Sequence, residues 1–136
     1  MKTKFLFATS LALSGFLIFN VITAFQPKKP WVVPAKYLSM KNAAPSNAES
    51  VKNGKELYMK NCQSCHGKSG HGDGTKAAQL KTEPGDFSQV DVQKQPDGAL
   101  FYKISEGRED MPSFKKKIPD EEDTWSLVNY IRTLNK

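Results

Sequence analysis

The residues with the clearest chemical potential are the chain's only two cysteines, which lie in the run Cys62-Gln63-Ser64-Cys65-His66. Two thiols at this spacing form a disulfide, a redox-active pair, part of a zinc site or an attachment point for haem. A four-ligand zinc site would have only His66 and His71 to draw on beyond the thiols. A thioredoxin-like site follows a strand in a βαβ unit, and the sequence predicts no such unit.

The histidine next to the second cysteine favours haem attachment. In a C-x-x-C-H run both thiols add to the vinyl groups of haem, and the adjacent imidazole binds the iron. The run uses both cysteines of the chain and directly follows a predicted helix. We therefore expect Cys62 and Cys65 to hold one covalent haem c and His66 to be an iron ligand. A disulfide or a chance match is the alternative.

Short helices must position these residues, because residues 49–136 show apolar side chains at helical spacing and no alternation typical of strands. A first helix is predicted from Ser50 to Lys60 and runs directly into Cys62. A middle helix is predicted from Asp97 to Glu106, with Asp97 as its N-cap and Gly107 as a left-handed stop.

The last predicted helix carries the strongest signals. Asp120 is a suitable N-cap, and the acidic run that ends at Asp123 suits the positive end of the helix dipole. Apolar residues then recur along one face, at Trp125, Val128, Ile131 and Leu134. Because a domain of fewer than about 100 residues buries a modest core, a bound cofactor would add needed stability.

From about residue 49 to the C-terminus the chain resembles a class I cytochrome c, a family of small all-helical monohaem proteins. The matching features are the Cys62-x-x-Cys65-His66 run, Gly54 and Tyr58 before it, Met111-Pro112, and Trp125, Tyr130 and Ile131 in the last helix. The resemblance implies an all-α fold of short helices wrapped around one covalent haem, with the first and last helices crossing near Gly54. It also implies that Met111 is the second iron ligand, opposite His66.

The other methionines are weaker candidates for that ligand. Met1 and Met40 precede the domain, and Met59 lies only seven residues before His66. Met111 lies 45 residues after His66, and the proline that follows it indicates a loop rather than a packed helix face. Ordinary apolar packing is the alternative role for Met111.

The glycine-rich segment 67–87 resembles the loop beneath the proximal histidine in this family. A proline carbonyl often orients the histidine ring there, which implies that role for Pro84. His71, the other conceivable ligand, is expected to be exposed to solvent. Candidates for the walls of the haem pocket are Phe87, Leu100, Phe101, Ile104, Phe114 and Trp125.

The N-terminal residues predict export. Lys2 and Lys4 precede an apolar run from Phe5 to Phe25, so residues 1–25 form either a cleaved export signal or a membrane anchor. As a helix this run would span roughly 31 Å, about the thickness of a bilayer core. Both alternatives place the remaining residues on the periplasmic side of the cytoplasmic membrane.

Residues 26–48 predict an extended linker, since they contain four prolines and four lysines and show little periodicity. The chain is thus divided into residues 1–25, the linker 26–48 and a haem domain at 49–136. Some linker side chains, such as Trp31 and Tyr37, are too apolar for a purely solvated tether.

The charge distribution excludes nucleic acid as a partner. The net charge of +6 belongs to residues 1–48, which hold six lysines and no acid, so residues 49–136 are formally neutral. A nucleic-acid-binding domain concentrates positive charge on its folded part. A content of 38% hydrophobic and 25% charged residues also excludes a disordered chain and a protein with several membrane spans.

A histidine and a methionine together fill both axial positions of haem iron and leave no vacancy for a substrate. We therefore expect a one-electron carrier rather than an enzyme, working between redox partner proteins in a respiratory or exported redox chain. One alternative is an electron-entry haem subunit of a larger membrane oxidoreductase complex. Another is an open-site haem enzyme or gas sensor, for which Arg108 near Met111 is the only support.

Overall fold

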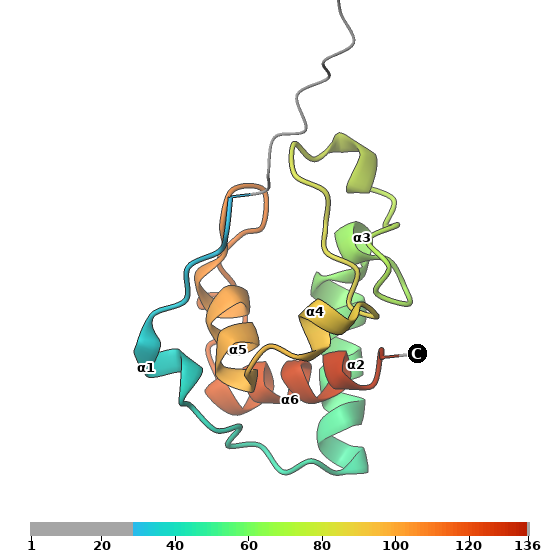
Figure 1. Cartoon of the computed structure of the whole chain (residues 1–136). Helices are drawn as coiled ribbons and strands as arrows, with labels where there is room; N and C mark the ends of the chain where they lie inside the picture. The colour runs from blue at the N-terminus through green and yellow to red at the C-terminus, as the bar shows by residue number, and fades with distance from the viewer. Residues whose placement is uncertain (1–28, 136) are drawn as a thin grey trace, which may run out of the picture. The chain divides into compact units, whose positions relative to one another are not determined.

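A computed structural model of the chain describes residues 29–135 (Figure 1). The predicted signal or anchor at residues 1–25 lies outside this range. Residues from Val32 onward belong to one compact unit. None of the helices within residues 29–135 is long and apolar enough to cross a membrane.

Short helices make up the regular structure of this unit. In chain order they are α1 (Ala35–Leu38), α2 (Ala48–Asn61), α3 (Gln63–His66), the 3-10 helix η1 (Ala77–Gln79), α4 (Val90–Gln93), α5 (Asp97–Glu106) and α6 (Glu121–Arg132). Between residues 29 and 135 the only strand-like feature is one bridge between Arg108 and Met111. The predicted all-α fold is therefore confirmed.

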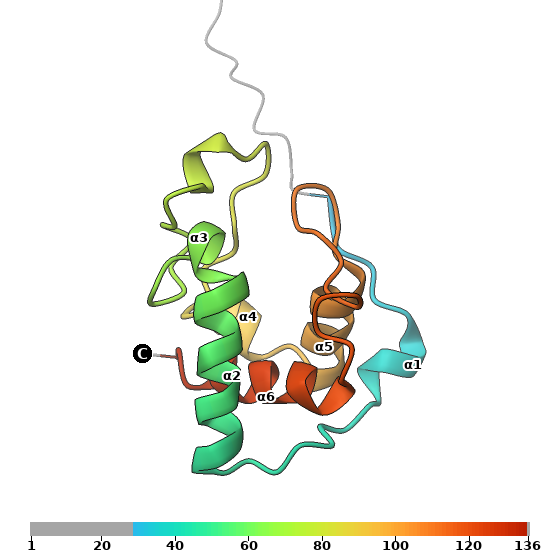
Figure 2. The same ribbon diagram turned by 180° about the vertical axis from the view of Figure 1, so that it is seen from behind.

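The longest helices, α2 and α6, cross at Gly54, as the family resemblance implies; Figures 1 and 2 show the crossing from opposite sides. A β-carbon at Gly54 would lie 2.0 Å from the carbonyl oxygen of Ser126 and 2.9 Å from the β-carbon of Tyr130. Only a glycine permits so close an approach of the two backbones. One turn further along α2, the ring of Tyr58 packs on that of Tyr130 with 5.1 Å between centroids.

Helix α5 spans the predicted residues and ends at Gly107, whose φ of 69° favours glycine but whose ψ of 173° differs from the predicted left-handed helical stop. Its start differs from the prediction, because Pro96 is the N-cap and Asp97 is the first helical residue. The Asp97 carboxylate accepts hydrogen bonds from Nε and Nη2 of Arg132, at 2.9 and 2.6 Å. It therefore joins the start of α5 to the end of α6 instead of capping its own helix.

The N-cap of α6 is as predicted, since the Asp120 side chain accepts a hydrogen bond from the backbone N–H of Glu122. The hydrophobic core lies between α5, α6 and residues 107–120, which join these two helices. Trp125 stacks on Phe101 with 4.2 Å between ring centroids. Further buried residues of this core are Leu100, Ile104, Phe114, Ile118, Leu127, Val128 and Ile131.

Part of the segment predicted as a linker contacts the helices. The Tyr37 ring in α1 lies 4.7 Å from the Tyr102 ring in α5, measured between centroids. Asn129 in α6 accepts a hydrogen bond from the Asn42 side chain at 2.8 Å and donates one to the Pro45 carbonyl at 3.2 Å. These contacts hold residues 37–45 against α5 and α6.

Candidate haem site

The end of α2 positions both cysteines and the first histidine. Cys62 ends α2 and begins α3, and its N–H donates to the Tyr58 carbonyl at 2.8 Å. The N–H groups of Cys65 and His66 then donate to the Cys62 carbonyl at 3.1 and 2.9 Å. The two thiols and the imidazole are therefore carried by one short helical turn.

The state of the thiols fits covalent attachment of haem. Cys62 and Cys65 are both free and half-buried. Burial raises the pKa of the Cys62 thiol to about 12. Two free thiols followed directly by an imidazole are the donor set that haem c requires.

The His66 ring is held by the chain beneath it. It stacks on the Phe87 ring with 4.5 Å between centroids and 19° between planes, and its Nδ1 lies 3.5 Å from the Gly85 carbonyl oxygen. Burial lowers the pKa of His66, which favours the neutral imidazole that binds iron.

The contact with Gly85 corrects the implied role of Pro84. The Pro84 carbonyl oxygen lies instead against Gly72, 2.5 Å from where a β-carbon would stand on that residue. The carbonyl of the following residue is therefore the one that faces the His66 ring. A carbonyl at this place can orient the imidazole and make it a more basic ligand.

The segment after the motif folds back onto it. The Tyr58 hydroxyl, fully buried, donates a hydrogen bond to the Gly67 carbonyl at 2.7 Å. Backbone N–H groups of Gly72 and Gly74 donate to the carbonyls of His66 and Cys65, at 2.9 and 3.2 Å. These bonds fix the orientation of α3 relative to the loop beneath it.

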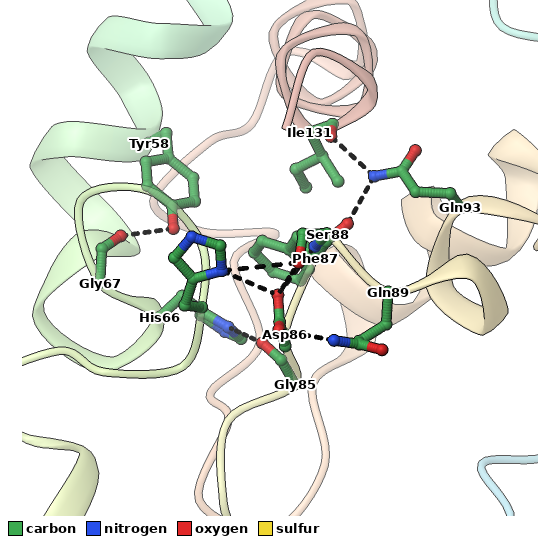
Figure 3. Close-up of polar contacts among 11 residues, drawn as sticks. Tyr58, His66, Gly67, Gly85, Asp86, Phe87, Ser88, Gln89, Gln93 and Ile131 are labelled. Atoms are coloured by element: carbon green, nitrogen blue, oxygen red, sulfur yellow. Dashed lines mark hydrogen bonds and ion pairs between the residues drawn. The ribbon is translucent and has the colours of Figure 1, made fainter. Parts of the chain in front are cut away.

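Asp86, which was not among the residues predicted for this site, is a hydrogen-bond acceptor next to it, as Figure 3 shows. Its carboxylate accepts from the Ser88 hydroxyl at 2.7 Å and from the Gln89 amide at 2.9 Å, and it contacts Nδ1 of His71 at 3.2 Å. The bonds from Gln89 and Ser88 hold the pKa of Asp86 well below its usual range. The available signal was an aspartate two residues before a serine, typical of an Asx turn.

His71 is exposed and its ring faces Asp86, as expected for a residue that is not an iron ligand. Among residues 29–135, no three His, Cys, Asp or Glu side chains gather as a metal-binding group. His66 and His71 thus do not combine with the thiols into a four-ligand site.

Met111 lies in a tight turn after α5. Arg108 and Met111 exchange two backbone hydrogen bonds, from the Arg108 N–H at 2.8 Å and from the Met111 N–H at 2.9 Å. Beyond the turn, the Ser113 hydroxyl donates to the Ser105 carbonyl of α5 at 2.6 Å. The Met111 side chain is half-buried and packs against the hydrophobic core.

The other described methionines lie elsewhere. Met40 follows α1, Met59 lies within α2, and both pack against the core. Of the proposed pocket walls, Leu100, Phe101, Ile104, Phe114 and Trp125 are buried in the core cluster, whereas Phe87 is partly exposed and lies against His66.

Comparison with known proteins assigns a family to the part of the chain that contains this site. Residues 49–131 match the model of the family described as cytochrome c oxidase, cbb3-type, subunit III. A c-type cytochrome, KustC0563, is 30% identical; the match covers 61% of this chain and 98% of that one, with a TM-score of 0.54. No curated protein matches the chain.

Two further structures share the fold at lower identity. One is a chain of the reducing HAO-like protein complex Kustc0457/Kustc0458 from Kuenenia stuttgartiensis, 22% identical with a TM-score of 0.61. The match covers 82% of this chain but only 53% of that one, about half of its length. The other is cytochrome CL from the marine methylotrophic bacterium Methylophaga aminisulfidivorans, 18% identical with a TM-score of 0.56, covering 82% of this chain and 72% of that one.

Proposed function

The chain belongs to the family of cbb3-type cytochrome c oxidase subunit III, and we propose that it carries single electrons through a haem c whose axial ligands are His66 and Met111. The observation that carries the proposal is the pair of free thiols with an adjacent imidazole, supplied by Cys62 between α2 and α3 and by Cys65 and His66 within α3. When bound there, haem supplies an iron that takes one electron from a donor protein and passes it to an acceptor.

His66 is proposed as the proximal ligand. Its Nδ1 faces the Gly85 carbonyl, so Nε2 of the neutral ring would be the nitrogen that binds iron. Phe87 stacks on the ring and restricts its rotation. The chain thus holds the imidazole in one orientation, which reduces the rearrangement that accompanies each change in iron charge.

Met111 is proposed as the distal ligand. Its support is its position in a hydrogen-bonded turn, fastened to α5 through Ser113 and packed against the core. A thioether is a soft ligand that favours ferrous iron and raises the reduction potential. With both axial positions filled, the residues around the haem bind no substrate, which is the reason to propose electron transfer rather than catalysis.

The test is the absorption spectrum of the haem-loaded chain with and without carbon monoxide. We expect the ferric protein to show the weak far-red sulfur-to-iron band and the ferrous protein not to bind carbon monoxide. The variant Met111→Ala should lose the band and bind carbon monoxide, while the control Met59→Ala should behave as the unaltered chain. Carbon monoxide binding by the unaltered chain would favour the open-site enzyme or sensor, and a chain without covalent haem would refute the proposal.

We further propose export to the periplasmic side of the cytoplasmic membrane, with residues 1–25 as a cleaved signal or an anchor. The attached haem supports this, because c-type cytochromes work in exported redox chains. Mass spectrometry of the mature protein tests the two alternatives. A chain that still begins at residue 1 and fractionates with membranes indicates an anchor.

A fixed subunit in a larger redox complex is the second candidate function. The observation that favours it is a pair of exposed apolar side chains in the N-terminal part of the unit, Val32 at 80% exposure and Leu38 at 47%. Affinity purification from solubilised membranes distinguishes the candidates. A stoichiometric partner that is lost in a Val32→Ser, Leu38→Ser double variant indicates a subunit, whereas a mobile carrier is recovered alone.

A further inference from the structure

The turn that carries Met111 is fastened to the chain on the His66 side of the domain. The Asp110 carboxylate accepts hydrogen bonds, through a single oxygen, from the backbone N–H groups of Lys81 at 2.8 Å and Thr82 at 3.0 Å. Beside it, the Glu109 carboxylate accepts a bond from the Thr82 hydroxyl at 2.9 Å. We call these three hydrogen bonds the loop clasp.

The local backbone places both acids at the tip of the turn. Gly107 at a φ of 69° reverses the chain after α5, and the two bonds between Arg108 and Met111 close the turn. Glu109 adopts a φ of 55°, a left-handed conformation that is unfavourable for a residue other than glycine. The bonds that the tip makes to residues 81 and 82 offset this cost, since hydrogen bonds to a carboxylate are stronger than neutral ones.

The loop clasp joins the segments that hold the two proposed iron ligands. Asp110 immediately precedes Met111, and Thr82 lies three residues before Gly85, whose carbonyl faces the His66 ring. On its other side the Met111 turn is fastened to α5 by Ser113. Without Asp110 the turn would keep only the bond between Glu109 and the Thr82 hydroxyl to this segment, besides its bonds to α5.

We propose that Asp110 is a positioning residue that keeps Met111 on the iron, by fastening the Met111 turn to the backbone of Lys81 and Thr82. This inference rests on the proposed function, in which Met111 is the distal ligand. A turn freed at its tip gives Met111 more positions away from the iron. An external ligand then binds more tightly at the iron position that Met111 leaves, because Met111 competes for that position less of the time.

The test measures imidazole binding to the ferric, haem-loaded full chain by the shift of its main absorption band. We expect Asp110→Ala to bind imidazole about tenfold more tightly than the unaltered chain, as the loss of two bonds to a charged acceptor would allow. Asp110→Asn retains an oxygen that can accept both N–H bonds and should stay within about twofold.

The matched control is Asp120→Ala, which also removes an aspartate that accepts a backbone N–H, but at the start of α6. It should lower stability through the lost N-cap and leave imidazole affinity unchanged. An equal gain in affinity in Asp120→Ala and Asp110→Ala would show a general loosening of the domain and overturn the inference.

Hydrogen exchange at the amides of Lys81 and Thr82 is a second readout that does not require Met111 to bind iron. Both amides should exchange slowly in the unaltered chain and fast in Asp110→Ala. Fast exchange in the unaltered chain, or a loss of protection without a gain in imidazole affinity, would overturn the inference. Imidazole binding by the unaltered chain as tight as by Met111→Ala would instead refute the ligand assignment, and the inference with it.

Discussion

Tyr58 is the side chain that links the helical turn at residues 62–66, the proposed haem-binding turn, to the crossing of α2 and α6. Its hydroxyl donates to the Gly67 carbonyl, one residue after His66, and its ring packs on Tyr130. Burial raises the pKa of Tyr58, so the hydroxyl stays protonated and remains a donor. One residue thus joins the position of His66, the proposed proximal ligand, to the main helix contact.

We expect Tyr58→Phe to lower the free energy of unfolding by about 1–2 kcal/mol, because the Gly67 carbonyl loses its buried donor. The covalent haem should be retained. Denaturant unfolding of the haem-loaded protein measures the change. Tyr102→Phe is the control, since that residue is half-exposed and its ring contacts Tyr37 at the surface; equal losses in the two variants would contradict the assigned role.

The lowered pKa of Asp86 makes the free energy of unfolding depend on pH. Because hydrogen bonds from Gln89 and Ser88 depress its pKa in the folded protein, the unfolded chain binds more protons below about pH 4. The stabilisation from Asp86 is complete above that pH and is lost as the pH falls toward the depressed native pKa. The stability difference between the unaltered chain and Asp86→Asn should therefore shrink from pH 5 to pH 2, as unfolding curves at each pH would show. A stability difference between the two proteins that stays constant from pH 5 to pH 2 would contradict the proposed effect of Asp86.

Residue identities at the site were predictable where covalent chemistry demands a spacing, and unpredictable where a contact depends on backbone direction. The Cys62-x-x-Cys65-His66 run favours haem attachment, because that chemistry uses both thiols and the adjacent imidazole. Which of the adjacent carbonyls, that of Pro84 or that of Gly85, faces the His66 ring depends on the path of the backbone, which the residue types alone do not specify. The contacts of Asp110 with Lys81 and Thr82 join residues far apart in sequence through backbone groups, so no residue pattern marks them.

At the scale of elements, the crossing of α2 and α6 holds the haem-binding turn in place. Ser50 and Ser126 are hydrogen-bonded across it at 3.0 Å, and the Asn53 amide donates to Asp123 at 2.7 Å. The Gly54 contact follows directly after Asn53 along α2. The two helices therefore meet through backbone, polar and aromatic contacts along much of α2.

We expect Gly54→Ala to destabilise the haem-loaded protein by about 1–3 kcal/mol, although alanine is the better helix former, because its β-carbon would overlap the Ser126 carbonyl. Thermal unfolding followed at the haem band measures the loss. Gly85→Ala is the control, since a β-carbon there meets nothing within 4 Å. A Gly54→Ala protein as stable as this control would contradict the close crossing.

Helix existence was predictable from periodicity and capping residues, whereas the partners of the caps were not. Asp120 caps α6 as its position before an acidic first turn indicates. Asp97 shows the same local pattern, but Arg132 reaches it from the end of α6 and takes its carboxylate. A tertiary ion pair thus overrides a local capping preference, and only the three-dimensional arrangement reveals it.

At the scale of the whole molecule, the residues before α2 contribute to the stability of the folded unit and do not serve only as a tether. Residues predicted as a linker supply Tyr37 to the surface of α5 and the buried Ala44 to the core. Asn129 of α6 receives two of its hydrogen-bond partners, Asn42 and Pro45, from this segment. We propose that the tether proper ends near Val32, and that the rest of the segment belongs to the folded unit.

A chain that begins at residue 49 should therefore unfold at a lower temperature than one that begins at residue 32, when both carry haem. The shorter chain loses the Tyr37 contact and leaves Asn129 without these partners. Thermal unfolding of the two proteins, each exported behind the same cleavable signal, measures the difference. Equal midpoints would show that residues 32–48 act only as a tether.

The crossing of α2 and α6 also sets an order of assembly. Gly54 and Ser126 are separated by 72 residues, and α6 is the last of the described helices to be synthesised. Contacts of such long range form late, because the intervening chain must first be closed into a loop. A nascent chain that has already exposed Cys62 and Cys65 therefore still lacks the helix that completes the fold. Until α6 has packed on α2, the segment that carries both thiols therefore lacks its main tertiary contact.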